Sequence, residues 1–172
     1  TGKYFAYQHY GILPDVVTMA KPIAGGLPLG AILTTNEVSS CLHPGMHGTT
    51  FGGGPLACAV ALEVLNVIEK KKLLRSNEKL GEYFRKQLSK LQKKHSCIKD
   101  VRGMGLFIGA ELDSADLAKA VAAKMLEKSI IINRTNETVL RFLPPYIIEK
   151  KHVDEVVMGL DKVLTTLTEG KK

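Results

Sequence analysis

The chain changes character near residue 70, and this change most limits how it can fold. Residues 1–69 contain two lysines against four carboxylates, a net charge of −2. Because the whole chain of 172 residues carries +7, residues 70–172 carry +9. The order of hydrophobic patterns also differs on the two sides of this point. We therefore predict two domains, residues 1–70 and residues 71–172.

The first part combines two short strands with one helix. Residues 15–20 and 29–34 are rich in β-forming residues, and the Pro- and Gly-containing segment 21–28 separates them. Residues 37–46 predict a short helix followed by a loop. Pro55 suits the first turn of a longer helix, in which apolar residues recur at helical spacing. These apolar residues are Leu56, Val60, Val64, Val67 and Ile68.

The second part has the order helix, strands, helix, strands, helix, which is typical of a small α+β layer domain. With 45% hydrophobic residues, the chain can bury a core. The predicted elements are a helix through residues 73–91, strands within 100–112, a helix capped at residue 113 or 114, strands at 130–132 and 139–143 that flank a turn at 135–136, and a final helix from 153 to 167.

The basic residues between Lys70 and Lys99 do not predict a nucleic-acid interface. They share a segment with apolar residues at helical spacing and with the i,i+4 pair Glu82 and Lys86, so they indicate the solvated face of an amphipathic helix. No aromatic residues are interleaved with them in a recognisable motif. No run of about 18 apolar residues occurs, so we expect no membrane-spanning segment.

Histidines and cysteines do not form a recognisable metal or disulfide pattern. His43 and His47 have the spacing of zinc ligands on a helix, but Pro44 and Gly45 interrupt that helix. We therefore expect no metal site. The chain has three cysteines, an odd number at wide spacing, which argues against a disulfide framework and favours a reducing compartment.

Lys21 is distinguished by its position at the end of an apolar strand and the start of a Pro/Gly loop. Besides Lys3, it is the only lysine in the first 69 residues. Partial desolvation at such a strand end would favour the neutral amine that forms a Schiff base. Most surface lysines are simply solvated, so position alone leaves that alternative open.

Thr49 and Thr50 precede a glycine-rich stretch, Gly52–Gly54, and the start of a predicted helix. Free N–H groups and the helix dipole favour an anion at such a place, which indicates a phosphate site. The alternative is structural, with the glycines forming a turn and the threonines capping the helix. The sequence does not decide between the two.

Arg141 lies in a predicted strand with Val139 and Leu143 on its own face. A guanidinium among apolar neighbours needs an anionic partner or must extend to water, and its planar fork matches a carboxylate. Arg141 is therefore a candidate for binding a substrate carboxylate. A structural ion pair is the alternative.

Six segments follow one another in the order of a known family: residues 1–6, 14–21, 26–31, 47–59, 101–106 and 140–145. They resemble the class III aminotransferases, and among these most closely the acetylornithine aminotransferases. The resemblance covers nearly the whole chain and is more specific than any single motif. Many relatives have Gly in place of Pro22 and Asn in place of Gly54, and both variants resemble plant-type members.

The resemblance implies an α/β fold, namely the C-terminal part of a fold-type-I pyridoxal-phosphate transferase. Residues 1–70 would complete the large α/β cofactor domain, and residues 71–172 would form the small α+β domain. The implied cofactor is pyridoxal 5'-phosphate, bound to Lys21 as a Schiff base. The implied roles of the other residues are cofactor phosphate binding across subunits for Thr50, substrate contact for Thr49, and binding of the α-carboxylate of the amino acid or 2-oxoglutarate for Arg141.

The resemblance also implies a homodimer that transfers the amino group of N-acetylornithine to 2-oxoglutarate in arginine biosynthesis. The expected location is the cytoplasm, or the mitochondrial matrix or a plastid in a eukaryote. Alternative donors are ornithine, succinyl-diaminopimelate and 4-aminobutyrate.

The family's chain is much longer, and three of its active-site features precede the segments found here. These are an Asp at the pyridinium nitrogen, a phosphate-binding loop and an aromatic residue that stacks on the ring. Because the chain also starts with Thr1 instead of Met, we expect it to begin inside a longer protein and to be inactive alone. The alternative is a non-catalytic fragment or interaction module.

Overall fold

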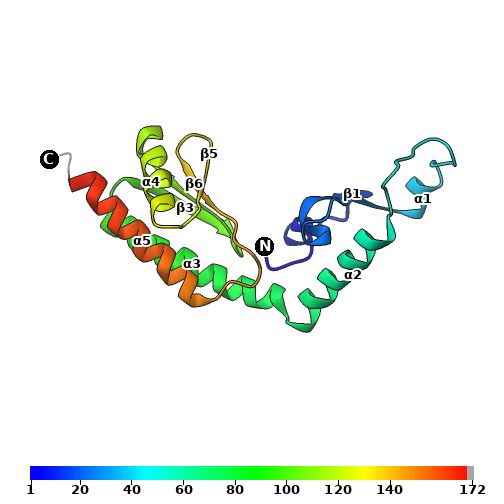
Figure 1. The fold of residues 1–172 in the computed structure, drawn as a ribbon, viewed down its shortest axis with the longest axis horizontal. Coiled ribbons are helices and arrows are strands. Elements are labelled where there is room, and N and C mark those ends of the chain that lie inside the picture. The colour runs from blue at the N-terminus through cyan, green and yellow to red at the C-terminus, as the bar shows by residue number, and fades with distance from the viewer. Residues whose placement is uncertain (170–172) are drawn as a thin grey trace. The chain divides into compact units, whose positions relative to one another are not determined.

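The structure, a computed structural model, describes residues 1–169. These residues form two compact units, and Figure 1 labels most of their elements. Lys3–Leu73 make up one unit, hereafter the N-terminal unit. Thr1–Gly2 together with the residues from Leu74 onward make up the other, hereafter the C-terminal unit. That the N-terminal unit completes a larger cofactor domain stays a prediction.

The N-terminal unit contains a two-stranded antiparallel sheet and one long helix. Met19 pairs with Ala31, so the segment that starts at Lys21 connects the paired ends of the two strands. The short helix followed by a loop that was predicted over 37–46 is confirmed, with the helix ending at Ser39. Pro44 and Gly45 follow too closely for it to continue. The elements are η1 (Ala6–His9), β1 (Val16–Met19), η2 (Lys21–Ala24), β2 (Ala31–Thr34), α1 (Asn36–Ser39) and α2 (Pro55–Lys70).

Helix α2 buries only one side within this unit. Ala61 and Ile68 are buried, whereas Leu56 and Leu62 remain 71% and 64% exposed. Phe51, just before the helix, is 90% exposed. Apolar side chains this exposed indicate a surface that other residues cover in a stable protein.

The C-terminal unit is a four-stranded antiparallel sheet in the order β3-β4-β6-β5, with three helices packed on one face (Figure 1). Alternate residues of β4 and β6 contribute to a single core with one side of each helix. The strands are β3 (Ile98–Met104), β4 (Phe107–Leu112), β5 (Asn133–Thr135) and β6 (Val139–Phe142), and the helices are α3 (Leu73–Lys94), α4 (Ala115–Glu127) and α5 (Lys150–Glu169). The most deeply buried large side chains are Leu88, Ile108, Met125, Leu140, Leu164, Val121 and Val153.

Helix α3 approaches the turn between β3 and β4 very closely at Gly81. A Cβ atom at this position would lie 1.9 Å from the carbonyl oxygen of Gly105, which is less than any real contact allows. The guanidinium of Arg85, one turn further along α3, donates to the same oxygen at 3.4 Å. The absence of a side chain at Gly81 therefore sets the distance between α3 and the sheet.

The strand predicted at residues 130–132 is wrong, because β5 begins at Asn133. The hairpin turn fixes the register, with Thr135 opposite Val139 and positive φ angles of 45° and 59° at Asn136 and Glu137. Continuing that register would place Ile130 opposite Pro144, which has no N–H to donate. The same register would place Ile131 and Ile132 opposite Leu143 and Phe142, but pairing in the structure ends at Asn133.

A polar cluster joins the end of α3 to α5. The ring Nε2 of His95, whose side chain is only 6% exposed, lies 2.6 Å from Oδ1 of Asp161. Lys94 donates to the other carboxylate oxygen of Asp161 at 2.7 Å. The hydrogen bonds from Lys94 and then from His95 hold the pKa of Asp161 below its ordinary value.

We predict that Asp161→Asn lowers the free energy of unfolding at neutral pH by roughly 1 kcal/mol, since the pair is partly screened by solvent. A carboxyl group whose pKa is depressed by folding stabilises the native state above its unfolded pKa, near 4, and loses this effect as the pH falls further. The difference between variant and wild type should therefore shrink below about pH 4. Denaturant unfolding at a series of pH values measures it. Glu155→Gln, an exposed position on the same helix, is the control and should leave the pH dependence unchanged.

Candidate active site

Lys21 has a backbone conformation that a lysine rarely adopts. β1 ends at Met19, Ala20 is extended, and Lys21 then starts η2 with a φ of 60°. The other four non-glycine residues with positive φ among the described residues lie just after α2 or α4 or in the β5–β6 turn, where this conformation is common. At Lys21 the conformation costs energy without ending a helix or forming a hairpin, as is often found at functional residues.

The side chain of Lys21 is exposed, so the expected partial desolvation is not provided by residues 1–169. That expectation is wrong for the described chain. The physical reason is that β1 has only one neighbouring strand and that Ala24 is the only buried residue of η2. Any wall that surrounds this amine must come from residues other than these.

The loop that carries Lys21 is held by α2. Ala24 is fully buried, and a Cβ atom on Gly25 would lie 3.3 Å from Val64 and 3.8 Å from Val60 of that helix. Gly25 itself has a φ of 61°, a conformation suited to glycine. Val60 follows Pro55 by five residues, so the contact begins about 7–8 Å along the axis from the start of α2. One helix thus positions the lysine loop near its N-terminal half.

Thr49 and Thr50 lie just before the same helix, and both are exposed. The helix starts at Pro55, and at Gly54, the capping residue before it, no side chain accepts a hydrogen bond from the first turn. The threonine-capping alternative is therefore wrong, whereas the glycines do form a turn, with Gly54 N–H donating to the carbonyl of Phe51 at 3.3 Å. A Cβ atom on Gly52 would lie 2.0 Å from Thr49 Cγ2, so this glycine leaves room for the Thr49 side chain. The arrangement leaves hydroxyl groups beside a helix N-terminus, which suits a phosphate.

Arg141 lies in β6 on the face of the sheet opposite the core. Its guanidinium makes no ion pair with any residue in the described range 1–169, so the structural ion-pair alternative is not supported. The Nε atom is buried and has no hydrogen-bond partner there. A buried N–H without a partner is costly, so this position calls for a partner such as water, a ligand or another part of the protein.

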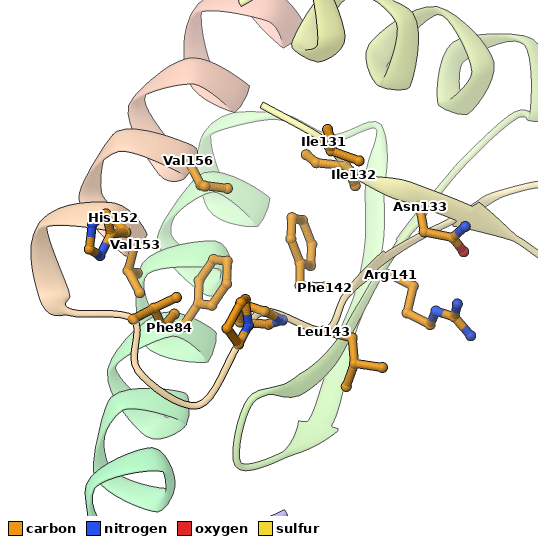
Figure 2. A pocket seen from close by; sticks show the side chains of 13 residues that line it. Phe84, Ile131, Ile132, Asn133, Arg141, Phe142, Leu143, His152, Val153 and Val156 are labelled. Carbon is orange, nitrogen blue, oxygen red and sulfur yellow. The ribbon is translucent and has the colours of Figure 1, made fainter. Parts of the chain in front are cut away.

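A cavity of about 420 Å³ adjoins Arg141 at the end of β6. Its interior is apolar and includes Phe84 and Phe142, whose rings meet edge to face with centroids 5.1 Å apart. Figure 2 shows that the Arg141 side chain projects away from these rings and toward the same side as Asn133. Sequence reasoning did not select Asn133, although the register of the β5–β6 hairpin could have indicated it.

The four selected residues are divided between the units. Lys21, Thr49 and Thr50 belong to the N-terminal unit, where α2 contacts the lysine loop and begins just after the threonines, and Arg141 belongs to the C-terminal unit. Within residues 1–169, no group of three or more His, Cys, Asp or Glu side chains could hold a metal ion. In the same range no helix is both long and apolar enough to cross a membrane.

Comparison with known proteins identifies the family. Residues 1–164 match the family described as aminotransferase class-III. This chain belongs to the class III aminotransferases. The family depends on pyridoxal 5'-phosphate, and a chain with an exposed primary amine and free hydroxyls at a helix start has the chemical groups to bind an aldehyde and a phosphate. The residues present therefore fit that cofactor.

Similar proteins include several aminotransferases of known name. An acetylornithine aminotransferase of Methanocaldococcus jannaschii is 48% identical over 171 residues, covering 97% of this chain and 42% of that protein. One from Caldanaerobacter subterraneus is 46% identical over 167 residues, covering 97% of this chain and 42% of that protein. A leucine/methionine racemase of Thermococcus litoralis is 40% identical over 179 residues, covering 99% of this chain and 40% of that protein.

Solved structures confirm the fold as the C-terminal portion of a fold-type-I enzyme. The ornithine aminotransferase of Toxoplasma gondii matches with a TM-score of 0.92 and 36% identity, over 99% of this chain and 41% of that one. The acetylornithine aminotransferase of Elizabethkingia anophelis matches with a TM-score of 0.89 and 35% identity, over 96% of this chain and 42% of that one. The chain thus spans about two fifths of the length of the relatives that it matches.

We predict that Lys21→Gly is more stable than Lys21→Ala by about 1 kcal/mol, because only glycine adopts a positive φ without steric cost. Both variants remove the amine, so the comparison isolates the backbone. Thermal unfolding of the two variants, made in the longer protein, measures the difference. The same pair of substitutions at Thr18, in the extended strand β1, should give the opposite order. Equal stability of the two Lys21 variants would contradict the strained conformation.

Proposed function

We propose that the longer protein containing this chain transfers the amino group of N-acetylornithine to 2-oxoglutarate, with pyridoxal phosphate as cofactor. The observation that carries this proposal is the strained, exposed Lys21 at the end of β1, in a chain of this family. Several of the most similar relatives bear the name acetylornithine aminotransferase, in archaeal and bacterial organisms. The reaction would serve arginine biosynthesis.

Each selected residue has one task in this proposal. When bound, the cofactor supplies an electron-withdrawing ring that would stabilise charge at the substrate carbon that carries the transferred amino group. The Lys21 amine would hold the cofactor covalently and then move a proton between the substrate carbon that carries the amino group and the cofactor C4′. Thr50, with the first N–H groups of α2, would bind the cofactor phosphate of the partner subunit in a homodimer. Thr49 would contact the substrate, and Arg141 would bind its α-carboxylate bidentately.

Other donors are the second candidate. The solved structures that match include ornithine aminotransferases, and the relatives include an acetylornithine/succinyldiaminopimelate aminotransferase of Yersinia pestis and a succinylornithine transaminase of Photorhabdus laumondii. Each candidate donor carries a carboxylate, which is the group that Arg141 would bind, so the four residues do not distinguish the donors. The values of kcat/KM for N-acetylornithine, ornithine, succinyl-diaminopimelate and 4-aminobutyrate, measured on the longer protein, decide between the candidates.

We also infer that residues 1–172 alone do not catalyse the reaction. Residues 1–169 leave the Lys21 amine exposed, and large apolar side chains such as Phe51 and Leu56 lie open to solvent. An imine in water lacks the electrostatic environment that stabilises developing charge. We therefore expect the isolated residues 1–172 to be non-catalytic. In this proposal, the transaminase activity belongs to the longer protein.

We predict that borohydride reduction of the longer protein with bound cofactor attaches the phosphopyridoxyl group to Lys21. The attachment follows from the strand-end position of the amine. Peptide mapping by mass spectrometry locates the modified residue. Lys21→Arg is the matched control and should remain unlabelled. Labelling of a different lysine in active protein would contradict the assignment. In a separate transaminase assay, the purified 172-residue chain with excess cofactor should show negligible turnover.

We predict that Arg141→Ala in the longer protein weakens binding of both N-acetylornithine and 2-oxoglutarate by about 10- to 150-fold, since a charge-assisted bidentate pair is worth roughly 1.5–3 kcal/mol. The absorbance of the bound cofactor should stay unchanged, because Arg141 does not hold it. Steady-state kinetics and cofactor spectra measure the two effects. Arg141→Lys should recover part of the affinity, because lysine keeps the positive charge but lacks the planar guanidinium that makes two parallel hydrogen bonds. Wild-type constants for both substrates in Arg141→Ala would remove Arg141 from the site.

A further inference from the structure

The immediate surroundings of Arg141 on its face of the sheet are fixed by the strand register. Its two direct cross-strand neighbours are Gly109 on β4 and Asn133 on β5. Along β6 and its extension, Val139 and Leu143 share the same face. Gly109 has no side chain, and the other two in-strand neighbours are aliphatic. Asn133 is therefore the one direct neighbour of Arg141 on this face that can form a side-chain hydrogen bond, whereas Glu111 and Thr135 lie in the diagonal positions opposite Val139.

The side chains of Asn133 and Arg141 lie close together, and within residues 1–169 neither forms a hydrogen bond. Directly opposed residues of an antiparallel pair have Cβ atoms about 4.5–5.5 Å apart. Both residues border the same cavity, and Figure 2 shows both side chains projecting to the same side. Asn133 is exposed, and neither its amide nor the Arg141 guanidinium forms a hydrogen bond with another residue of the described range 1–169.

Other polar groups close to this position are already engaged. Arg102, which faces Gly109 from β3, donates to Asp100 and Glu111 at 2.6 and 2.7 Å. His152, at the far side of the cavity, accepts from the backbone N–H of Glu149 at 2.9 Å. The guanidinium of Arg141 and the amide of Asn133 thus remain as the pair available to an anion.

We propose that Asn133 is a further substrate-binding residue, whose amide N–H donates to the same carboxylate that Arg141 binds. A carboxylate has two oxygens and about four acceptor sites, so two bonds from a guanidinium leave capacity for an amide donor. The neutral amide adds a directional bond without competing for the charge of Arg141. This inference rests on the proposed function, because it assigns Asn133 to the carboxylate site of that reaction.

The test measures binding of glutarate, a dicarboxylate with neither an amino nor a keto group, to the longer protein by calorimetry. Asn133→Ala should weaken glutarate binding about 3- to 10-fold, the effect of one lost hydrogen bond. Asn133→Asp should weaken it more, because the new carboxylate pairs with Arg141 and repels the ligand. In turnover, both Asn133 variants should raise KM for both substrates while kcat changes less than about twofold.

Arg134→Gln is the matched control. Arg134 is the next residue of β5, its side chain points to the opposite face, and it carries a positive charge. Its loss should leave glutarate binding unchanged. Wild-type affinity in Asn133→Ala and Asn133→Asp, or an equal loss in Arg134→Gln, would overturn the role of Asn133. If the wild-type protein neither binds glutarate nor transfers an amino group, the proposed function itself fails, which is a different result.

Discussion

The two-residue alternation of β6 is the constraint on which the C-terminal unit depends. Leu140 and Phe142 point into the core between the sheet and its three helices, so Arg141 between them must point to the other face. A shift of the register by one residue would bury the guanidinium among aliphatic side chains and expose Phe142. The same packing that stabilises the core therefore presents the cation, and burial of its two neighbours holds it in place.

The elements of the C-terminal unit follow largely from its hydrophobic periods. The spacing of Phe84, Leu88 and Leu91 predicted the buried side of α3, and the structure buries all three. Local β-propensity failed at residues 130–132, because strand pairing needs a partner and β6 is followed by two prolines. By β-propensity alone, a segment of three isoleucines is predicted to be a strand. It does not form one here, because pairing with the neighbouring strand β6 ends at Asn133.

The site was predicted in part. Glycine and proline punctuation, together with the family resemblance, indicated Lys21, Thr49 and Thr50, and the structure shows how α2 supports the lysine loop. The positive φ of Lys21 could not be predicted, because it depends on how η2 packs against the valines of α2. Asn133 was missed for a related reason. Its importance comes from a cross-strand position, and an exposed asparagine near a turn has no distinctive pattern in the sequence.

The contact at Gly81 limits how this fold can vary or be redesigned. Glycine inside a helix costs about 1 kcal/mol relative to alanine, so an optimisation based on helix propensity would replace it first. A methyl group there would meet the carbonyl oxygen of Gly105 and force α3 away from the sheet. Phe84, less than one turn further along, would then leave its contact with Phe142. In sequences that share this packing, only glycine fits at position 81, because a neighbouring backbone oxygen leaves no room for a side chain.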